Sequence, residues 1–294
     1  MLKFARIAVE SQVKIVAVDD GRGRYWDIGQ TLPGFTGDMV DLIRRLNGER
    51  LITTSGDGQP LTEVKLLAPI DRPRRNLFCV GKNYHEHAKE FQHSGFDSSA
   101  VNGETAPEAP VFFTKPASTI TGPGDAIPSH ADVTDCLDYE AELAIVIGKG
   151  GRNIKAANAM EHIFGYTIVN DVTARDLQKR HRQWFLGKGL DGFCPMGPYI
   201  VPADQIDGQN LSIRCWVNGE LRQSSNTRDL IFGLPTLIET LSAGITLEPG
   251  DVIATGTPAG VGIGFTPPRY LNVGDTVRIE VEGIGVLENV VGPG

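Results

Sequence analysis

Three carboxylates stand at alternate positions just ahead of an apolar run in the segment 138–147, whose sequence is DYEAELAIVI. Successive side chains of a strand point to opposite faces, so Asp138, Glu140 and Glu142 are expected to share one face. The rest of the segment is apolar on both faces, which is typical of a buried strand and predicts that its acidic end lies in a cleft. An exposed strand end with solvated acids is the alternative.

A cation site is the chemistry that this carboxylate pattern favours. Carboxylate oxygens without thiolate or imidazole partners suit Mg²⁺, Mn²⁺ or Ca²⁺ better than zinc. Asp171 is a third candidate ligand, because it ends the apolar segment 165–171 at a strand-to-turn junction, a usual place for functional side chains. On its own it could equally cap a helix. Glu140, Glu142 and Asp171 together would carry three negative charges against the two positive charges of a divalent cation. Lys188 could offset the remaining negative charge, although a single lysine usually lies on the surface.

The stretch 83–90, NYHEHAKE, places two of the six histidines within three residues. A zinc site would need both on one side, which a strand allows and a helix does not, because helical residues two apart point in nearly opposite directions. In a helix, His87 and Glu90 are three residues apart and share one face. His85 has Lys89 as its neighbour instead. If the carboxylates hold the metal, His87 is therefore a candidate base and His85 a bystander.

Strands must position most of these residues, because short apolar segments with strand patterns dominate the chain and helical segments are few. The Asn-Gly pair within 211–225 predicts a hairpin. Together these patterns predict an α+β, mainly β fold. Helices are expected over 36–46, 154–164 and 230–244, and the first of them has Thr36 or Asp38 as its candidate cap. Strands are expected over 14–20, 24–29, 63–70, 76–81, 111–116, 138–148 and 165–171, and within 251–262 and 275–291.

Two units are expected along the chain. Residues 1–70 read as a small N-terminal α+β domain, and residues 71–294 as the catalytic domain. The polar stretch 71–75, DRPRR, suits a linker between them. A length of 294 residues allows this division of the chain.

Composition excludes several classes of function. A net charge of −8 without a Lys/Arg run argues against nucleic-acid binding. The N-terminus lacks a signal-peptide core, and the aliphatic run LAIVIG is too short to cross a membrane, so a cytoplasmic protein is expected. The four cysteines lie far apart, which argues against disulfides or a zinc ribbon. The glycine-rich stretches 148–153 and 256–264 are neither a P-loop nor a dinucleotide-binding turn.

Six segments in order resemble the fumarylacetoacetate hydrolase family. They are FCVGKNYHEHAKE, VFFTKPAST, DYEAELAIVIGKGGRNI, GYTIVNDVTARDLQ, GKGLDGFCPMGPYIV and ATGTPAGVG. The resemblance covers roughly residues 70–294 and implies a mixed β-sandwich roll and a homodimer. It implies Mg²⁺ or Mn²⁺ held by Glu140, Glu142 and Asp171. The remaining roles that it implies are an acid–base dyad of His87 and Glu90 on a mobile lid, substrate-facing Gln178 and Lys188, Lys115 at the substrate's edge, and Thr257 on a substrate carboxylate.

One position departs from the family pattern. The larger, true fumarylacetoacetate hydrolases carry another acidic group near Asn83, where this chain has an amide. The expected substrate is therefore a small 2-oxo acid other than fumarylacetoacetate. The expected activity is metal-dependent hydrolysis of a C–C bond in acylpyruvate-type 2,4-dioxo acids through a metal-stabilised enolate. The alternatives are a 2-hydroxy-dienoate isomerase or oxaloacetate-type decarboxylase of aromatic or sugar-acid breakdown, and a non-catalytic oxo-acid binding protein.

Overall fold

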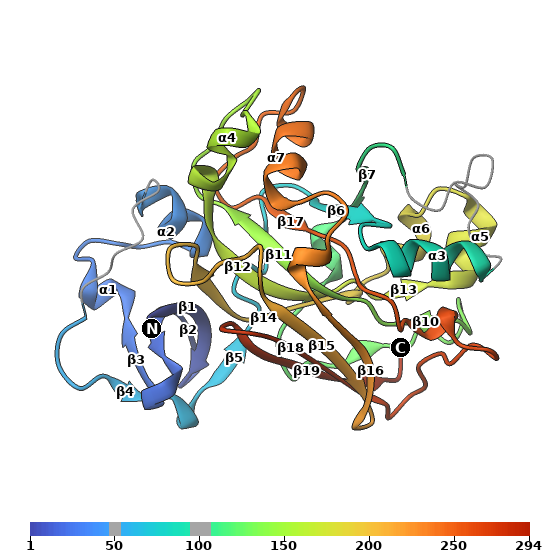
Figure 1. Cartoon of the computed structure of the whole chain (residues 1–294). Coiled ribbons are helices and arrows are strands. Elements are labelled where there is room, and N and C mark those ends of the chain that lie inside the picture. The colour runs from blue at the N-terminus through green and yellow to red at the C-terminus, as the bar shows by residue number, and fades with distance from the viewer. Residues whose placement is uncertain (47–53, 95–106) are drawn as a thin grey trace.

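The computed structural model describes residues 1–46, 54–94 and 107–294. Within them, one large sheet runs through both predicted units (Figure 1). Its strands are β1 (Lys3–Val9), β2 (Gln12–Asp19), β3 (Arg24–Asp27), β4 (Gln59–Pro60), β5 (Lys65–Leu67), β6 (Leu77–Gly81), β7 (Val111–Lys115), β8 (Ile120–Thr121), β11 (Ala141–Ile147), β12 (Ile163–Asn170), β14 (Cys194–Pro202) and β17 (Val252–Ala254). The main path is β4-β3-β2-β1-β14-β12-β11-β17-β6-β7, with β5 beside β1 and β8 beside β14.

A smaller sheet packs against the large one. Its order is β16-β15-β18-β19-β9, formed by β9 (Ile127–Pro128), β15 (Ser212–Val217), β16 (Glu220–Asn226), β18 (Thr276–Val281) and β19 (Gly285–Gly292). The predicted hairpin of β15 and β16 is confirmed. Its turn residues Asn218 and Gly219 have φ of 51° and 79°, the left-handed pair that a tight two-residue hairpin requires.

The helices are short and lie outside the two sheets (Figure 1). Asp38 caps α2, because its carboxylate accepts from the Asp41 N–H at 2.9 Å while its own N–H donates to the Asp41 carboxylate at 3.1 Å. Of the two predicted caps, Asp38 is thus the one that is used. The helices are α1 (Ile28–Thr31), α2 (Met39–Leu46), α3 (His85–His93), α4 (Ala156–Ala159), α5 (Arg175–His181), α6 (Phe185–Lys188) and α7 (Leu234–Ser242).

The central strand β11 is buried along its whole length, as its apolar pattern predicts. Its alternate residues enter two different cores. Leu143 and Ile145 pack with residues of the small sheet such as Ile279. Ala144 and Val146 pack with the α2 layer and the N-terminal strands. Both faces of β11 are therefore covered, one by the small sheet and the other by α2, which agrees with the α+β, mainly β fold and keeps water from this strand.

The acidic end of this strand differs from its prediction. Residues 138–147 do not form one strand, because β10 (Leu137–Asp138) pairs with β13 (Thr173–Ala174) and β11 begins only at Ala141. The Asp138 carboxylate accepts from the backbone N–H groups of Gly262 and Ile263. The expectation that Asp138 shares one strand face with Glu140 and Glu142 is therefore wrong, because the strand is broken after Asp138 and its carboxylate binds the backbone of a later loop.

The N-terminal unit is joined to the main sheet by backbone pairing. β1 pairs with β14 at Phe4 and Ile200, and the side chains of both residues enter the same core. The boundary at residue 70 stays a prediction. In the described part of the chain, no helix has the length and apolar character needed to span a bilayer.

Candidate active site

The structure brings Glu140, Glu142 and Asp171 together. One carboxylate oxygen from each lies within 4.8 Å of the others, and all three side chains are buried. Antiparallel pairing of Ala141 with Asn170 places the start of β11 beside the end of β12, and the Asp171 N–H donates to the Glu140 carbonyl at 2.9 Å. Asp171 caps no helix, since α5 begins at Arg175. The cluster therefore arises from the register of two buried strands.

Two buried lysines neutralise part of this acidic cluster. The Lys188 ammonium at the end of α6 lies 2.7 Å from an oxygen of Glu140 and 2.7 Å from one of Asp171. Lys115 lies 2.7 Å from the other Asp171 oxygen and donates to the Val172 carbonyl at 3.0 Å. Asp171 is thus held between two ammonium groups.

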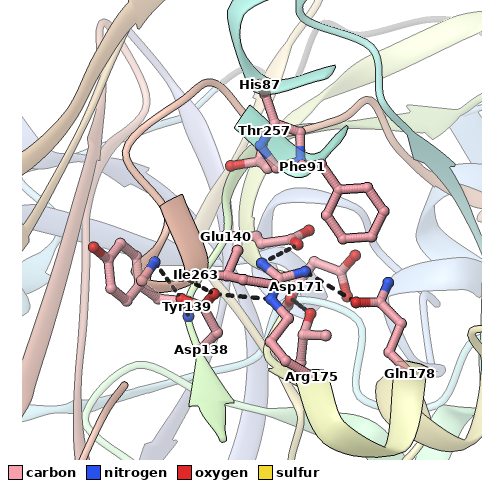
Figure 2. A network of polar contacts seen from close by, with 12 residues as sticks. His87, Phe91, Asp138, Tyr139, Glu140, Asp171, Arg175, Gln178, Thr257 and Ile263 are labelled. Carbon is pink, nitrogen blue, oxygen red and sulfur yellow. Dashed lines mark hydrogen bonds and ion pairs between the residues drawn. The ribbon is translucent and has the colours of Figure 1, made fainter. Parts of the chain in front are cut away.

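Arg175 is a site residue that the sequence analysis missed. Its guanidinium joins Asp138 at 2.8 Å, Glu140 at 2.7 Å and the side-chain oxygen of Gln178 at 3.2 Å (Figure 2). The side chain is 1% exposed. Its sequence signal was a charged residue four positions after Asp171, at the start of the helix that carries Gln178.

The charges of the cluster shift the pKa values of its members in opposite directions. Burial alone would raise the pKa of Glu140, but the cations of Lys188 and Arg175 lower it to about 2. Burial and the neighbouring charges of Asp171 and Glu140 raise the pKa of Glu142 well above its usual range. Burial would lower the pKa of Lys188, but Asp171 and Glu140 outweigh it and raise it. These charges therefore favour the charged form of Lys188 and the protonated form of Glu142.

Glu142 carries the test of whether a cation fits. Its carboxylate accepts from the Gly256 N–H at 2.8 Å, and within the described residues it forms no ion pair. A buried carboxylate next to two others is costly unless a cation or a proton balances it. Three convergent carboxylate oxygens without sulfur or imidazole form a donor set that Mg²⁺ or Mn²⁺ accepts. The residues present therefore fit a divalent cation.

Cation binding is expected to release a proton from Glu142. Because burial and the neighbouring carboxylates raise the pKa of Glu142 and favour its protonated form, we expect a cation to displace that proton, and the affinity for the cation should rise with pH until the carboxyl ionises unaided. Isothermal titration with Mg²⁺ at neutral pH, in two buffers of different ionisation enthalpy, measures the protons released. Glu142→Gln should abolish the release. Identical heats in both buffers for the unaltered chain would contradict the expectation.

The histidine of the candidate dyad lies above the cluster on α3. His87 Nδ1 is 3.2 Å from one Glu90 oxygen, and the other Glu90 oxygen accepts from the Gly260 N–H at 2.9 Å. The imidazole is 5% exposed. His85 lies elsewhere and lines a separate hollow with Ser224 and Arg228. The helix thus separates the two histidines as its periodicity predicts.

A small cavity lies between His87 of the dyad and Glu140 and Glu142 of the cluster. One part of its wall is aromatic and another is charged. The lining includes His87, Glu140, Glu142, Arg175, Gln178, Lys188 and Thr257, together with Phe91, Phe113 and Trp184. Among the predicted substrate contacts, Lys115 is not one of the residues that line this cavity, and its ammonium is paired with Asp171. Its role toward a substrate stays a prediction.

Comparison with known proteins agrees with this geometry. The sequence model described as "Fumarylacetoacetate (FAA) hydrolase C-terminal" matches residues 76–292. The chain belongs to this family. It is 54% identical over 233 residues to oxaloacetate tautomerase YisK of Bacillus subtilis, covering 79% of this chain and 74% of that protein.

Solved structures of the fumarylacetoacetate hydrolase family extend the likeness to the whole chain. A fumarylacetoacetate hydrolase from Exiguobacterium antarcticum superposes with a TM-score of 0.85 at 45% identity, covering 100% of both chains. A 2-hydroxyhepta-2,4-diene-1,7-dioate isomerase from Mycobacterium marinum gives 0.77 at 36% identity, covering 100% of this chain and 99% of the other. Enzymes of this family commonly use a divalent metal, and this member has the buried acidic cluster for one.

Two polar residues of the cavity wall match the expected substrate contacts of the family. The Thr257 hydroxyl accepts from the Gln223 amide at 2.8 Å, which leaves its own O–H as a donor. The Gln178 oxygen is occupied by Arg175, so its NH₂ group is the part left for a ligand. Both line the cavity, and their substrate roles stay predictions.

Asn83, where this chain departs from the larger family members, has a structural task. Its amide donates to the Phe232 carbonyl at 3.1 Å and the Thr255 carbonyl at 2.8 Å, and accepts from the Phe232 N–H at 2.8 Å. A carboxylate could make only the last of these bonds. The amide therefore ties the chain just ahead of α3 to two other segments.

Proposed function

We propose that this family member is a divalent-metal-dependent tautomerase of small 2-oxo acids, with a dicarboxylate such as oxaloacetate as its substrate. The observation that carries the proposal is a buried base, His87, that lines the same small cavity as Glu140 and Glu142 of the carboxylate cluster. Support also comes from the relative named oxaloacetate tautomerase and the structural neighbours named as isomerases. The names of these relatives favour the isomerase alternative over the C–C hydrolase that we first expected.

Keto–enol exchange needs one proton moved between carbon and oxygen. His87 would take a proton from C3 of the 2-oxo acid, and the C–H electron pair would form the C2=C3 bond. Charge would then develop on the 2-oxo oxygen, close to the ammonium of Lys188, and a proton returned to that oxygen completes the enol. Glu90 would hold the imidazole in place and stabilise its charged form. A bound Mg²⁺ or Mn²⁺, held by Glu140, Glu142 and Asp171, would supply Lewis-acid polarisation of the 2-oxo group.

Hydrolysis of acylpyruvates remains the second candidate, because one neighbour of 45% identity is titled a fumarylacetoacetate hydrolase. In that reaction His87 would activate a water molecule for attack on the distal carbonyl. Decarboxylation of oxaloacetate would use the same charged wall without water activation. A purely binding role would leave the His87–Glu90 pair without a task. A cytoplasmic homodimer remains our expectation for this chain.

A substrate panel tests the proposal. With Mg²⁺ or Mn²⁺, the enzyme should accelerate the loss of oxaloacetate enol absorbance well beyond the uncatalysed rate, and chelation should remove the acceleration. Acetylpyruvate and a hydroxymuconate-type diene serve as substrates for the competing reactions, and pyruvate release reports cleavage or decarboxylation. Acetylpyruvate cleavage that is faster than enol exchange would show that the hydrolase reading is correct instead.

A further inference from the structure

The glycine-rich stretch 256–264 matches no phosphate-binding motif, yet its last five residues occupy a special place. The sequence from Gly260 to Gly264 is GVGIG, here called the 260–264 loop. It runs between α3, which carries the candidate dyad, and the Asp138–Arg175 pair beside the carboxylate cluster. Both sides of this loop make specific contacts.

Beneath the loop, two adjacent residues hold its backbone. The Asp138 carboxylate accepts from the Gly262 N–H at 2.6 Å and the Ile263 N–H at 3.0 Å, and the Tyr139 hydroxyl donates to the Gly260 carbonyl at 2.8 Å. Asp138 is fully buried, and its charge is balanced by Arg175 at 2.8 Å. The break between β10 and β11 is what turns these two side chains toward the loop.

Above the loop, its backbone receives Glu90. The Gly260 N–H donates to one Glu90 oxygen at 2.9 Å, while the second oxygen faces His87. A β-carbon built on Gly264 would lie 1.8 Å from the Glu90 oxygen that accepts from Gly260 and 2.2 Å from the Glu90 carboxyl carbon. The Glu90 carboxylate therefore fills the space that a side chain at position 264 would need. Phe91 packs against Val261 and Ile263 and fixes α3 over the loop.

We propose that the 260–264 loop positions the acid–base pair of His87 and Glu90, with Gly264 and Tyr139 as positioning residues. Gly264 gives the Glu90 carboxylate its room, and Tyr139 keeps the Gly260 N–H aimed at it. Because His87 is oriented by Glu90, a displacement of the Glu90 carboxylate by the loop also changes the orientation of the His87 imidazole. The inference rests on the proposed function only in that His87 transfers a proton; it holds for any reaction that uses that base.

The main test is a double-mutant cycle of Gly264→Ala with Glu90→Ala. The clash at Gly264 meets only the end of a flexible side chain, so the variant should fold while Glu90 moves. We expect kcat to fall to about the level of Glu90→Ala, KM to change less than kcat, and Mg²⁺ affinity by calorimetry to stay unchanged. In the Glu90→Ala background, Gly264→Ala should add nothing, because coupled residues are non-additive.

Gly244→Ala is the matched control, since a β-carbon there meets open space, and it should leave kcat unaltered. Independent, multiplying effects of the two substitutions in the cycle would overturn the proposal. So would an unchanged kcat in Gly264→Ala.

Hydrogen exchange of the full chain gives a readout that needs no substrate. Amide exchange in α3, measured by mass spectrometry with Mg²⁺ present, should rise in Gly264→Ala and in the milder Tyr139→Phe, and not in Gly244→Ala. Unchanged amide exchange in both variants would refute the proposal that the 260–264 loop positions the acid–base pair. If the unaltered enzyme turns over no substrate of the panel, the proposed function fails. The exchange data would still test whether the 260–264 loop positions the acid–base pair.

Discussion

Replacing Asp171 by asparagine is expected to weaken divalent-cation binding and to reduce turnover about a thousandfold, because Lewis-acid stabilisation is worth several kcal/mol. Asparagine keeps the shape of the side chain but removes the charge that lies between Lys115 and Lys188. The two ammonium groups would then repel an incoming cation. Calorimetric titration with Mg²⁺ and Mn²⁺, beside steady-state assays at saturating metal, measures both effects.

The same substitution leaves two buried lysines short of a counter-charge, which can cost about 3–5 kcal/mol of stability. A thermal melt must therefore show that Asp171→Asn is folded at the assay temperature. Asp251→Asn is the control, because it also removes a buried carboxylate paired with an arginine, Arg75, but lies outside the site. Full Mg²⁺-dependent turnover in Asp171→Asn would show that the metal assignment is wrong.

Replacing His87 by glutamine should lower enol exchange by about 10²- to 10⁴-fold, the usual contribution of a general base. Glutamine can still form hydrogen bonds but cannot accept and return the substrate proton. The side chain lies outside the carboxylate cluster, so Mg²⁺ affinity should be unchanged. Stopped-flow measurement of enol decay, beside calorimetry, separates the two quantities.

His85→Gln supplies the matched control, because it alters the neighbouring histidine of the same helix that lines a different hollow. It should keep the activity of the unaltered enzyme. Enol exchange at that same level in His87→Gln would remove His87 from the mechanism. Decarboxylation of oxaloacetate that survives in this variant, while enol exchange is lost, would show that the enzyme carries a second reaction that does not need the base.

The carboxylate cluster was predictable because it depends on local rules. Alternation along a strand placed Glu140 and Glu142 on one face, and the end of the next buried strand supplied Asp171. The alternation rule failed at Asp138, because the break between β10 and β11 leaves no trace in a pattern of alternating acids. The role of Arg175 depends on that break, so its ion pairs with Asp138 and Glu140 could not be predicted from the sequence.

Long-range partners limited the prediction in the rest of the fold as well. The Asn218-Gly219 hairpin follows from neighbours in the chain and was predicted correctly, and Asp38 was one of the two caps that the local sequence offered. The position of β14 between β1 and β12 depends on which buried strands fit together in space, and no periodicity records that choice. The Glu90–Gly260 contact spans 170 positions, so the sequence around the glycine-rich stretch does not indicate that its backbone binds Glu90.

The pairing of β1 with β14 also sets an order of events in folding. β1 pairs with β14 at Ile200, which follows it by almost two hundred positions, and Lys3 donates to the Ile284 carbonyl, 281 positions later. Contacts of such high contact order form slowly, because the intervening chain must be closed first. The edge of β1 that β14 will cover therefore stays unpaired during synthesis, and that stage is when the chain is most open to association with its own copies.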